Sequence, residues 1–212
     1  MKSKTQTQVI AGIVILVLVI GTWATGSGWQ IKFLRFYSAA VLVASLALTL
    51  WDRVIWHLNP VQKLSNVPRD VRGTWKGVLA SDWKDPTTGV GVAAKDVFLA
   101  VRQTSSTVRV SLYTDESQSH SSIGSVSVGD EPLMLEYMYF NRPSNALEHR
   151  SRRHNGSTAL DITGRPASRL KGHYWTDRDT KGELVFEDHV QKRVDDYESA
   201  KTLFQSEQPS KL

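Results

Sequence analysis

Residues 69–80, Arg-Asp-Val-Arg-Gly-Thr-Trp-Lys-Gly-Val-Leu-Ala, mark a change in the character of the chain. Long apolar runs dominate the sequence before them, and short segments that alternate apolar and polar residues dominate the sequence after them. From Gly73 the stretch itself alternates, with Trp75 and Leu79 on the same face, which is the period-2 pattern of a β-strand. We interpret it as the first strand of a β-domain.

The triplet Gly73-Thr74-Trp75 resembles the Gly-x-Trp motif that opens small antiparallel barrels such as lipocalins and streptavidin, in which the indole closes one end. Three residues are a weak motif, and a core tryptophan in a β-sandwich is the alternative interpretation. The number and spacing of the following strands must distinguish the two.

Eight segments rich in β-branched and aromatic residues predict strands, separated by turn residues such as Asn155-Gly156. Short strands joined by short turns favour an eight-stranded up-and-down β-barrel of lipocalin or streptavidin type, because closure removes exposed sheet edges. We expect this barrel over residues 69–193, and a short helix and disordered tail over 194–212. The predicted strands lie near residues 72–83, 94–104, 107–115, 121–128, 133–141, 156–163, 169–176 and 182–190.

Residues 1–57 contain two apolar segments, at about 7–26 and 35–56, and each is close to the roughly 20 residues that cross a bilayer. A cleaved signal peptide is the alternative for the first segment, because two lysines precede a short apolar core. The second segment favours two transmembrane helices, followed by a connector over 58–68. The predicted fold class is therefore a membrane-anchored all-β protein.

The charges of the chain bear on its partners and its orientation. Residues 1–56 hold five Lys or Arg and one Asp, a net charge of +4, whereas the remainder holds 21 basic and 20 acidic residues. This near-neutral remainder disfavours a DNA or RNA polymer as ligand. Basic residues are more frequent outside the two spans than between them, so the positive-inside rule predicts a multi-pass protein with both termini and the β-domain in the cytoplasm.

Motifs for catalysis or metal binding are weak in this sequence. The chain has no cysteine, no Walker loop and no Gly-x-Ser-x-Gly. His173 and His189 could form a catalytic or metal pair, but solvated strand histidines are the commoner case. The basic run at 149–154 is either a charged loop or a site for phosphate or anionic lipid. We predict that the protein is not an enzyme and carries no metal or cofactor.

A set of aromatic, hydroxyl and basic residues is predicted to face one space inside or at the rim of the barrel. Tyrosines offer stacking faces and hydroxyls, and arginines bind phosphate oxygens in a two-pronged geometry. An eight-stranded barrel can hold one small ligand or be filled by side chains, so tyrosines as filling and arginines as solvated rim remain the alternative. The candidate ligand-binding residues are Trp75, Tyr137, Tyr139, Arg142, Tyr174, Thr176 and Arg178.

Small residues in the second apolar segment suggest a helix-packing face. Ala40 and Ala44 are one helical turn apart, and small residues allow transmembrane helices to approach closely. A helix that is simply rich in alanine is the alternative.

The order of these parts, together with two motifs, resembles a known family. Two apolar helices precede one β-domain that opens on Arg-Gly-Thr-Trp-Lys-Gly (72–77) and closes on Gly-His-Tyr-Trp-Thr-Asp-Arg (172–178) with Lys-Gly-Glu-Leu (181–184). This resembles the two-transmembrane β-barrel effectors of bacterial anti-phage CBASS systems, the CD-NTase-associated protein 15 family, over nearly the whole chain. The resemblance implies a barrel that senses a cyclic dinucleotide made by a partner nucleotidyltransferase.

The resemblance further implies self-association in the inner membrane on ligand binding, loss of membrane integrity and abortive infection. It does not identify the ligand contacts, so the site residues depend on geometry alone. A membrane-tethered lipocalin-like carrier of a small molecule or lipid is the main alternative, followed by a structural membrane protein and a membrane enzyme.

Overall fold

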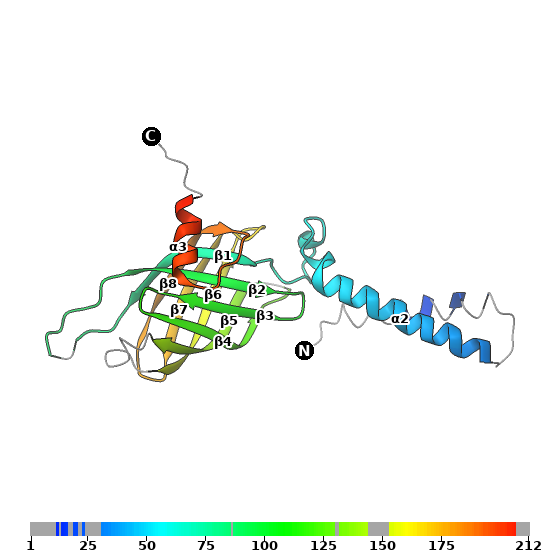
Figure 1. Ribbon diagram of the computed structural model, residues 1–212, viewed down its shortest axis with the longest axis horizontal. Coiled ribbons are helices and arrows are strands. Elements are labelled where there is room, and N and C mark those ends of the chain that lie inside the picture. The colour runs from blue at the N-terminus through cyan, green and yellow to red at the C-terminus, as the bar shows by residue number, and fades with distance from the viewer. Residues whose placement is uncertain are drawn as a thin grey trace. The chain divides into compact units, whose positions relative to one another are not determined.

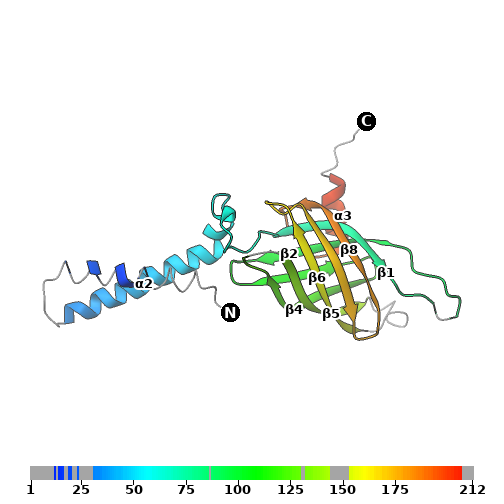
Figure 2. The same ribbon diagram turned by 180° about the vertical axis from the view of Figure 1, so that it is seen from behind.

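The computed structural model describes residues 12, 14–16, 19–20, 23, 31–85, 87–129, 132–143 and 153–206. It divides the chain into two compact units, Met1–Asn66 and Val67–Leu212, which we describe separately. Figures 1 and 2 show the helical first unit and the β-rich second unit from opposite sides.

The first unit contains one long helix, α2 (Ile31–Arg53), followed by two short 3-10 turns, η1 (Ile55–His57) and η2 (Val61–Lys63). Among the described residues, one helical segment, Ser38–His57, is long and apolar enough to cross a membrane. α2 begins at Ile31, before the predicted span of about 35–56, so Lys32 also belongs to the helix. Ala40 and Ala44 are 2% and 6% exposed.

The first predicted span, 7–26, lies largely outside the described residues. The described positions within it, 12, 14–16, 19–20 and 23, are helical. Two transmembrane helices therefore remain a prediction, whereas one candidate span is observed.

The second unit is a closed antiparallel barrel in which each strand pairs with its sequence neighbours and β1 pairs with β8. This confirms the predicted eight-stranded up-and-down barrel, and each predicted strand overlaps an observed one. The strands are β1 (Gly73–Ser81), β2 (Lys95–Gln103), β3 (Val108–Tyr113), β4 (Ser117–Val126), β5 (Met134–Pro143), β6 (His154–Thr163), β7 (Arg169–Thr176) and β8 (Lys181–Val190).

Alternation along the strands builds the core of the barrel. In β5, for example, Leu135, Tyr137 and Tyr139 are buried and the residues between them are partly or fully exposed. Inward positions of this kind from all eight strands fill the interior, because successive side chains of a strand point to opposite faces. The opposite face of each strand points away from the barrel interior.

One end of the barrel is closed by Trp75. Its side chain is fully buried, stacks on His189 at 4.1 Å between ring centroids, and donates from Nε1 to the Val71 carbonyl at 3.0 Å. Gly73, two residues before it, has φ +117°, and a Cβ there would lie 2.3 Å from the Val190 carbonyl oxygen. Only glycine fits this position, which explains why a glycine precedes the closing tryptophan.

Helix α3 (Tyr197–Ser206) lies on the outside of the barrel (Figure 1). Its buried residues Ala200, Leu203 and Phe204 pack against the outward side chains Phe98 of β2 and Tyr113 of β3. Asp196 precedes the helix and accepts hydrogen bonds from the backbone and hydroxyl of Ser199, as an N-terminal cap does. The tail predicted to be disordered lies outside the described residues.

Candidate functional site

A cavity of about 440 Å³ opens at the barrel end opposite Trp75. Inward residues from the same end of all eight strands line it, such as Ser81 of β1, Ser119 of β4 and Thr176 of β7. Trp75 and Ser81 share one face of β1, but six residues separate them, which is about 20 Å along a strand. The barrel therefore has a closed end and an open mouth.

Two tyrosines form the aromatic wall of the cavity. Tyr139 of β5 lies opposite Gly156 of β6, and Tyr174 of β7 lies opposite Gly182 of β8. A Cβ on Gly156 would lie 2.3 Å from the Tyr139 ring, and one on Gly182 would lie 2.7 Å from the Tyr174 ring. Each glycine thus makes room for a ring to lie over the neighbouring strand, which fixes the ring position.

Burial raises the pKa of the tyrosine hydroxyls in and below the cavity. Desolvation raises the pKa of Tyr139 and of Tyr174 above the ordinary value of 10.0, and for Tyr139 the nearby Tyr137 adds to the effect. Desolvation likewise raises the pKa of Tyr137 to about 12. All three hydroxyls therefore stay neutral at physiological pH and can donate as well as accept hydrogen bonds.

Beneath the tyrosines, two buried hydroxyls lack hydrogen-bond partners among the described residues. These are the Thr158 hydroxyl, on a residue 2% exposed that lines the cavity, and the Tyr137 hydroxyl beside it. Burial raises the Tyr137 pKa, and the nearby Thr158 hydroxyl partly offsets this rise. The two hydroxyls nevertheless form no hydrogen bond of standard geometry. Unpaired buried polar groups are costly, so these two hydroxyls lower the stability of the free protein.

Arg178 supplies a positive charge at the mouth. It lies in the β7–β8 turn, where its backbone N–H donates to the Thr176 hydroxyl at 3.3 Å. Its neighbour Asp177 accepts from the backbone and side-chain amides of Asn155, which lowers the Asp177 pKa. Within the described ranges Arg178 forms no ion pair, so its guanidinium is available for an anion.

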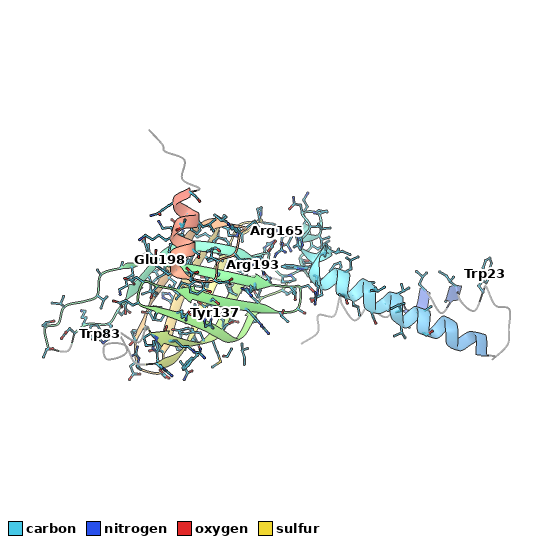
Figure 3. The ribbon with its side chains drawn as sticks, viewed as in Figure 1. Trp23, Trp83, Tyr137, Arg165, Arg193 and Glu198 are labelled. Atoms are coloured by element: carbon cyan, nitrogen blue, oxygen red, sulfur yellow. The ribbon has the colours of Figure 1, made fainter. Side chains whose placement is uncertain are left out.

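The connection between β1 and β2 extends the cavity wall outward. It projects beyond the strands as a hairpin whose ends are joined by a bridge between Lys84 and Gly91 (Figure 3). Trp83 on this hairpin lines the mouth and is 44% exposed. A half-exposed indole at the entrance to a cavity gives a third aromatic surface beside Tyr139 and Tyr174.

The structure brings four of the seven predicted ligand-binding residues to this cavity: Tyr139, Tyr174, Thr176 and Arg178. Tyr137 lies deeper, with its ring 6.0 Å from that of Tyr139 (Figure 3). The structure places the other two elsewhere. Trp75 shares the inward face but closes the opposite end, and Arg142 faces outward over the Phe140 ring because β5 continues to Pro143.

Several cavity residues were not predicted from the sequence. Asn141 of β5 and Ser119 of β4 are buried cross-strand neighbours, and Lys95 and Glu116 lie at the mouth. The serines of β4 could have indicated a polar cavity, because serines at the inward positions of a core strand are unusual. No local signal connects Lys95 with Glu116, because they meet only through the fold.

The histidines do not form the pair considered from sequence. His189 stacks on Trp75 at the closed end, while His173 faces solvent on β7. Among the described residues no cluster of three or more His, Cys, Asp or Glu side chains could hold a metal ion. The basic run at 149–154 lies mostly outside the described residues, and His154 at its end lines the cavity.

Comparison with known proteins bears on this site. Residues 65–188, which include the whole cavity, match the family model described as Cap15, cyclic dinucleotide receptor domain. The chain is also similar to CD-NTase-associated protein 15 of Staphylococcus schleiferi, with 26% identity over 156 residues, covering 74% of this chain and 80% of the relative.

Proposed function

The chain belongs to the Cap15 cyclic dinucleotide receptor domain family, and we propose that its barrel binds a cyclic dinucleotide in the cavity at the open mouth. The observation that carries this proposal is the meeting of two buried tyrosine rings with the Arg178 guanidinium, which has no ion-pair partner among the described residues, in one cavity. The proposed role is binding rather than catalysis, and the ligand is the activating molecule rather than a cofactor.

The chemistry of the cavity suits each part of such a ligand. A cyclic dinucleotide presents two flat bases, two sugars and two phosphodiesters. The rings of Tyr139, Tyr174 and Trp83 offer stacking surfaces, and Arg178 offers a phosphate partner. A volume of about 440 Å³ lies in the usual range for small-molecule sites.

We further propose that the protein is an effector of CBASS anti-phage defence. Its ligand would come from a partner nucleotidyltransferase, and binding would drive self-association and disruption of the inner membrane, which ends in abortive infection. A ligand can drive assembly only by binding the assembling state more tightly, and about 5.5 kcal/mol of differential affinity shifts a 1:99 population to 99:1.

The membrane part of this proposal depends on assembly of many copies. Between Ser38 and Trp51, α2 has no ionisable residue that could form an ion pathway within one chain. We propose two spans, with both termini and the barrel in the cytoplasm, and close helix contact through Ala40 and Ala44. Alkaline phosphatase activity of a C-terminal fusion would contradict this orientation.

Substitution of Arg178 tests the binding site. In full-length protein in detergent, Arg178→Ala should weaken binding of a cyclic dinucleotide by about 1.5–3 kcal/mol, the range for hydrogen bonds to charged groups. Arg142→Ala is the matched control, because it removes the same group from the outer face. Isothermal titration calorimetry measures both, and equal affinities for both variants and wild type would contradict the proposed site.

Substitution of Ala40 and Ala44 tests the membrane mechanism. Leucine at both positions keeps the helix apolar but prevents close approach, so the variant should insert and bind ligand yet fail to depolarise cells that make the ligand. Leu46→Ile on an exposed part of α2 is the control, and it should remain toxic. A double leucine variant as toxic as wild type would show that assembly does not use this face.

A further inference from the structure

An ion pair at the mouth of the cavity includes a carboxylate, which has the same sign of charge as the phosphates of the proposed ligand. Lys95 Nζ lies 2.6 Å from Glu116 Oε2, and both side chains line the cavity while staying about one-third exposed. Asp115 is a more distant partner of Lys95, at 3.9 Å, and does not line the cavity. Glu116 is thus an anion inside a site that is proposed to bind an anion.

The backbone fixes both members of this pair. Glu116 lies in the β3–β4 turn, where its N–H and that of Ser117 donate to the Thr114 hydroxyl at 3.2 and 2.8 Å. Thr114 in turn donates to the Ser117 carbonyl at 3.1 Å. Lys95 is the first residue of β2 and pairs with Leu79 of β1. Because hydrogen bonds fix the backbone of both residues, the Glu116 carboxylate has a defined position at the mouth.

The charges of the cavity wall are therefore few and nearly balanced. Lys95 and Arg178 are the cations and Glu116 is the anion among the Asp, Glu, Lys and Arg side chains lining it in the described part of the chain. Lys95 forms an ion pair with Glu116, whereas Arg178 has no ion-pair partner among the described residues. A site built for maximal anion affinity would omit Glu116.

We propose that Glu116 is a specificity-determining residue that disfavours linear dinucleotides relative to cyclic ones. The proposal rests on the proposed function of the cavity. A cyclic dinucleotide carries two phosphodiester charges. A linear one with a terminal phosphate carries one diester and a monoester of about −1.5 to −2, and so up to one further negative charge. The fixed Glu116 carboxylate repels the more highly charged ligand more strongly.

The same argument suggests what this discrimination achieves. Hydrolysis of one phosphodiester, by addition of water across a P–O bond, converts a cyclic dinucleotide into a linear one with a terminal phosphate. A receptor that rejects this product is switched off by phosphodiesterase-type hydrolysis of its ligand. Glu116 thereby sacrifices some affinity for the cyclic ligand to gain this selectivity.

Substitution of Glu116 tests the proposal in the full-length protein. Glu116→Gln should bind a cyclic dinucleotide about tenfold more tightly, because it removes a like charge and frees Lys95. It should also lower the ratio of cyclic to linear affinity by about threefold, since the linear ligand gains more. Both effects should shrink in 0.5 M salt, at which the Debye length falls to about 4 Å.

Two control variants separate this role from others. Glu116→Asp keeps the charge and should retain the wild-type selectivity. Glu187→Gln removes the same charge from an ion pair with Arg169 on the outer face, near the closed end, and should change neither affinity.

Calorimetry with one cyclic dinucleotide and its linear hydrolysis product distinguishes the outcomes. Tighter binding and reduced selectivity in Glu116→Gln support the proposal. Weaker binding of the cyclic ligand would overturn it and identify Glu116 as an acceptor for a base edge. If wild type binds and Glu116→Gln is unchanged, only this inference fails, whereas no binding by wild type overturns it together with the proposed function.

Discussion

The two ends of the barrel are made by the same eight strands, yet they treat polar groups in opposite ways. At the closed end the Trp75 indole, the His189 ring and the Gln103 amide all have hydrogen-bond partners on the backbone of residues 69–72. Beneath the mouth, Thr158 and Tyr137 have buried hydroxyls without partners among the described residues. The closed end contributes to stability, and the mouth is where we propose that the ligand binds.

This difference teaches where substitutions should affect folding and where they should affect binding. A satisfied and tightly packed end has no role left for a ligand, so its residues contribute to the free energy of unfolding. An end with unpaired donors and a cavity gives up stability that a bound molecule can restore. The predictions below test this division, beginning with the largest expected effect.

Removal of the closing tryptophan should have the largest effect. Trp75→Ala should lower the free energy of unfolding by about 3–5 kcal/mol, the range for a buried aromatic residue. Trp175→Ala is the control, since Trp175 faces outward on β7 and is 51% exposed, and it should change stability by less than about 1 kcal/mol. Chemical denaturation of the full chain in detergent, followed by β-sheet circular dichroism, measures both changes.

The Trp75→Ala variant also tests whether the closed end contributes to ligand binding. Trp75→Ala molecules that remain folded should bind the ligand with nearly wild-type affinity, because the indole is about 20 Å from the mouth along β1. A large loss of affinity at temperatures where the variant is folded would break the division between a stabilising end and a binding end.

Alkaline pH should destabilise the barrel through the buried Tyr137. Its pKa is raised to about 12 by burial, against about 10 in the unfolded chain. Below pH 10 the hydroxyl is neutral in both states and the stabilisation is complete. Between pH 10 and 12 only the unfolded state ionises, so this group's contribution of about 3 kcal/mol is progressively lost.

The Tyr137→Phe variant isolates this contribution. It should be less sensitive than wild type to a rise from pH 9 to pH 11, and no less stable at pH 7, because it removes a hydroxyl that has no partner of standard geometry among the described residues. Denaturation midpoints at several pH values measure the difference. Identical pH profiles for wild type and variant would mean that Tyr137 is not buried in the folded state as described.

The sequence predicted the fold better than the site, for a physical reason. Period-2 alternation and turn residues identify which face of a strand each side chain occupies, so Tyr139 and Tyr174 were correctly expected to point inward. Alternation does not give the height of a residue along the barrel, which depends on strand register. Trp75 was therefore expected beside residues that lie at the other end.

Strand ends limited the prediction in a second way. Arg142 was expected just past β5, but the strand continues to Pro143, and the alternation turns Arg142 outward. The pairing of Lys95 with Glu116 depends on how β2 and the β3–β4 turn meet in space. The spacing of residues in one sequence does not predict this contact, whereas the strand register of the barrel would.

The smallest expected effect gives the sharpest test of the two-ended design, because one substitution should act with opposite sign at each end. Thr74 near the closed end is fully buried and donates to the Lys192 carbonyl at 2.7 Å, so Thr74→Val removes this hydrogen bond and should cost about 1 kcal/mol. Thr158→Val removes a hydroxyl that has no partner among the described residues, and it should raise stability by up to about 1 kcal/mol. If both valine variants destabilise the free protein alike, the Thr158 hydroxyl is already paired within the fold and the mouth is no different from the closed end.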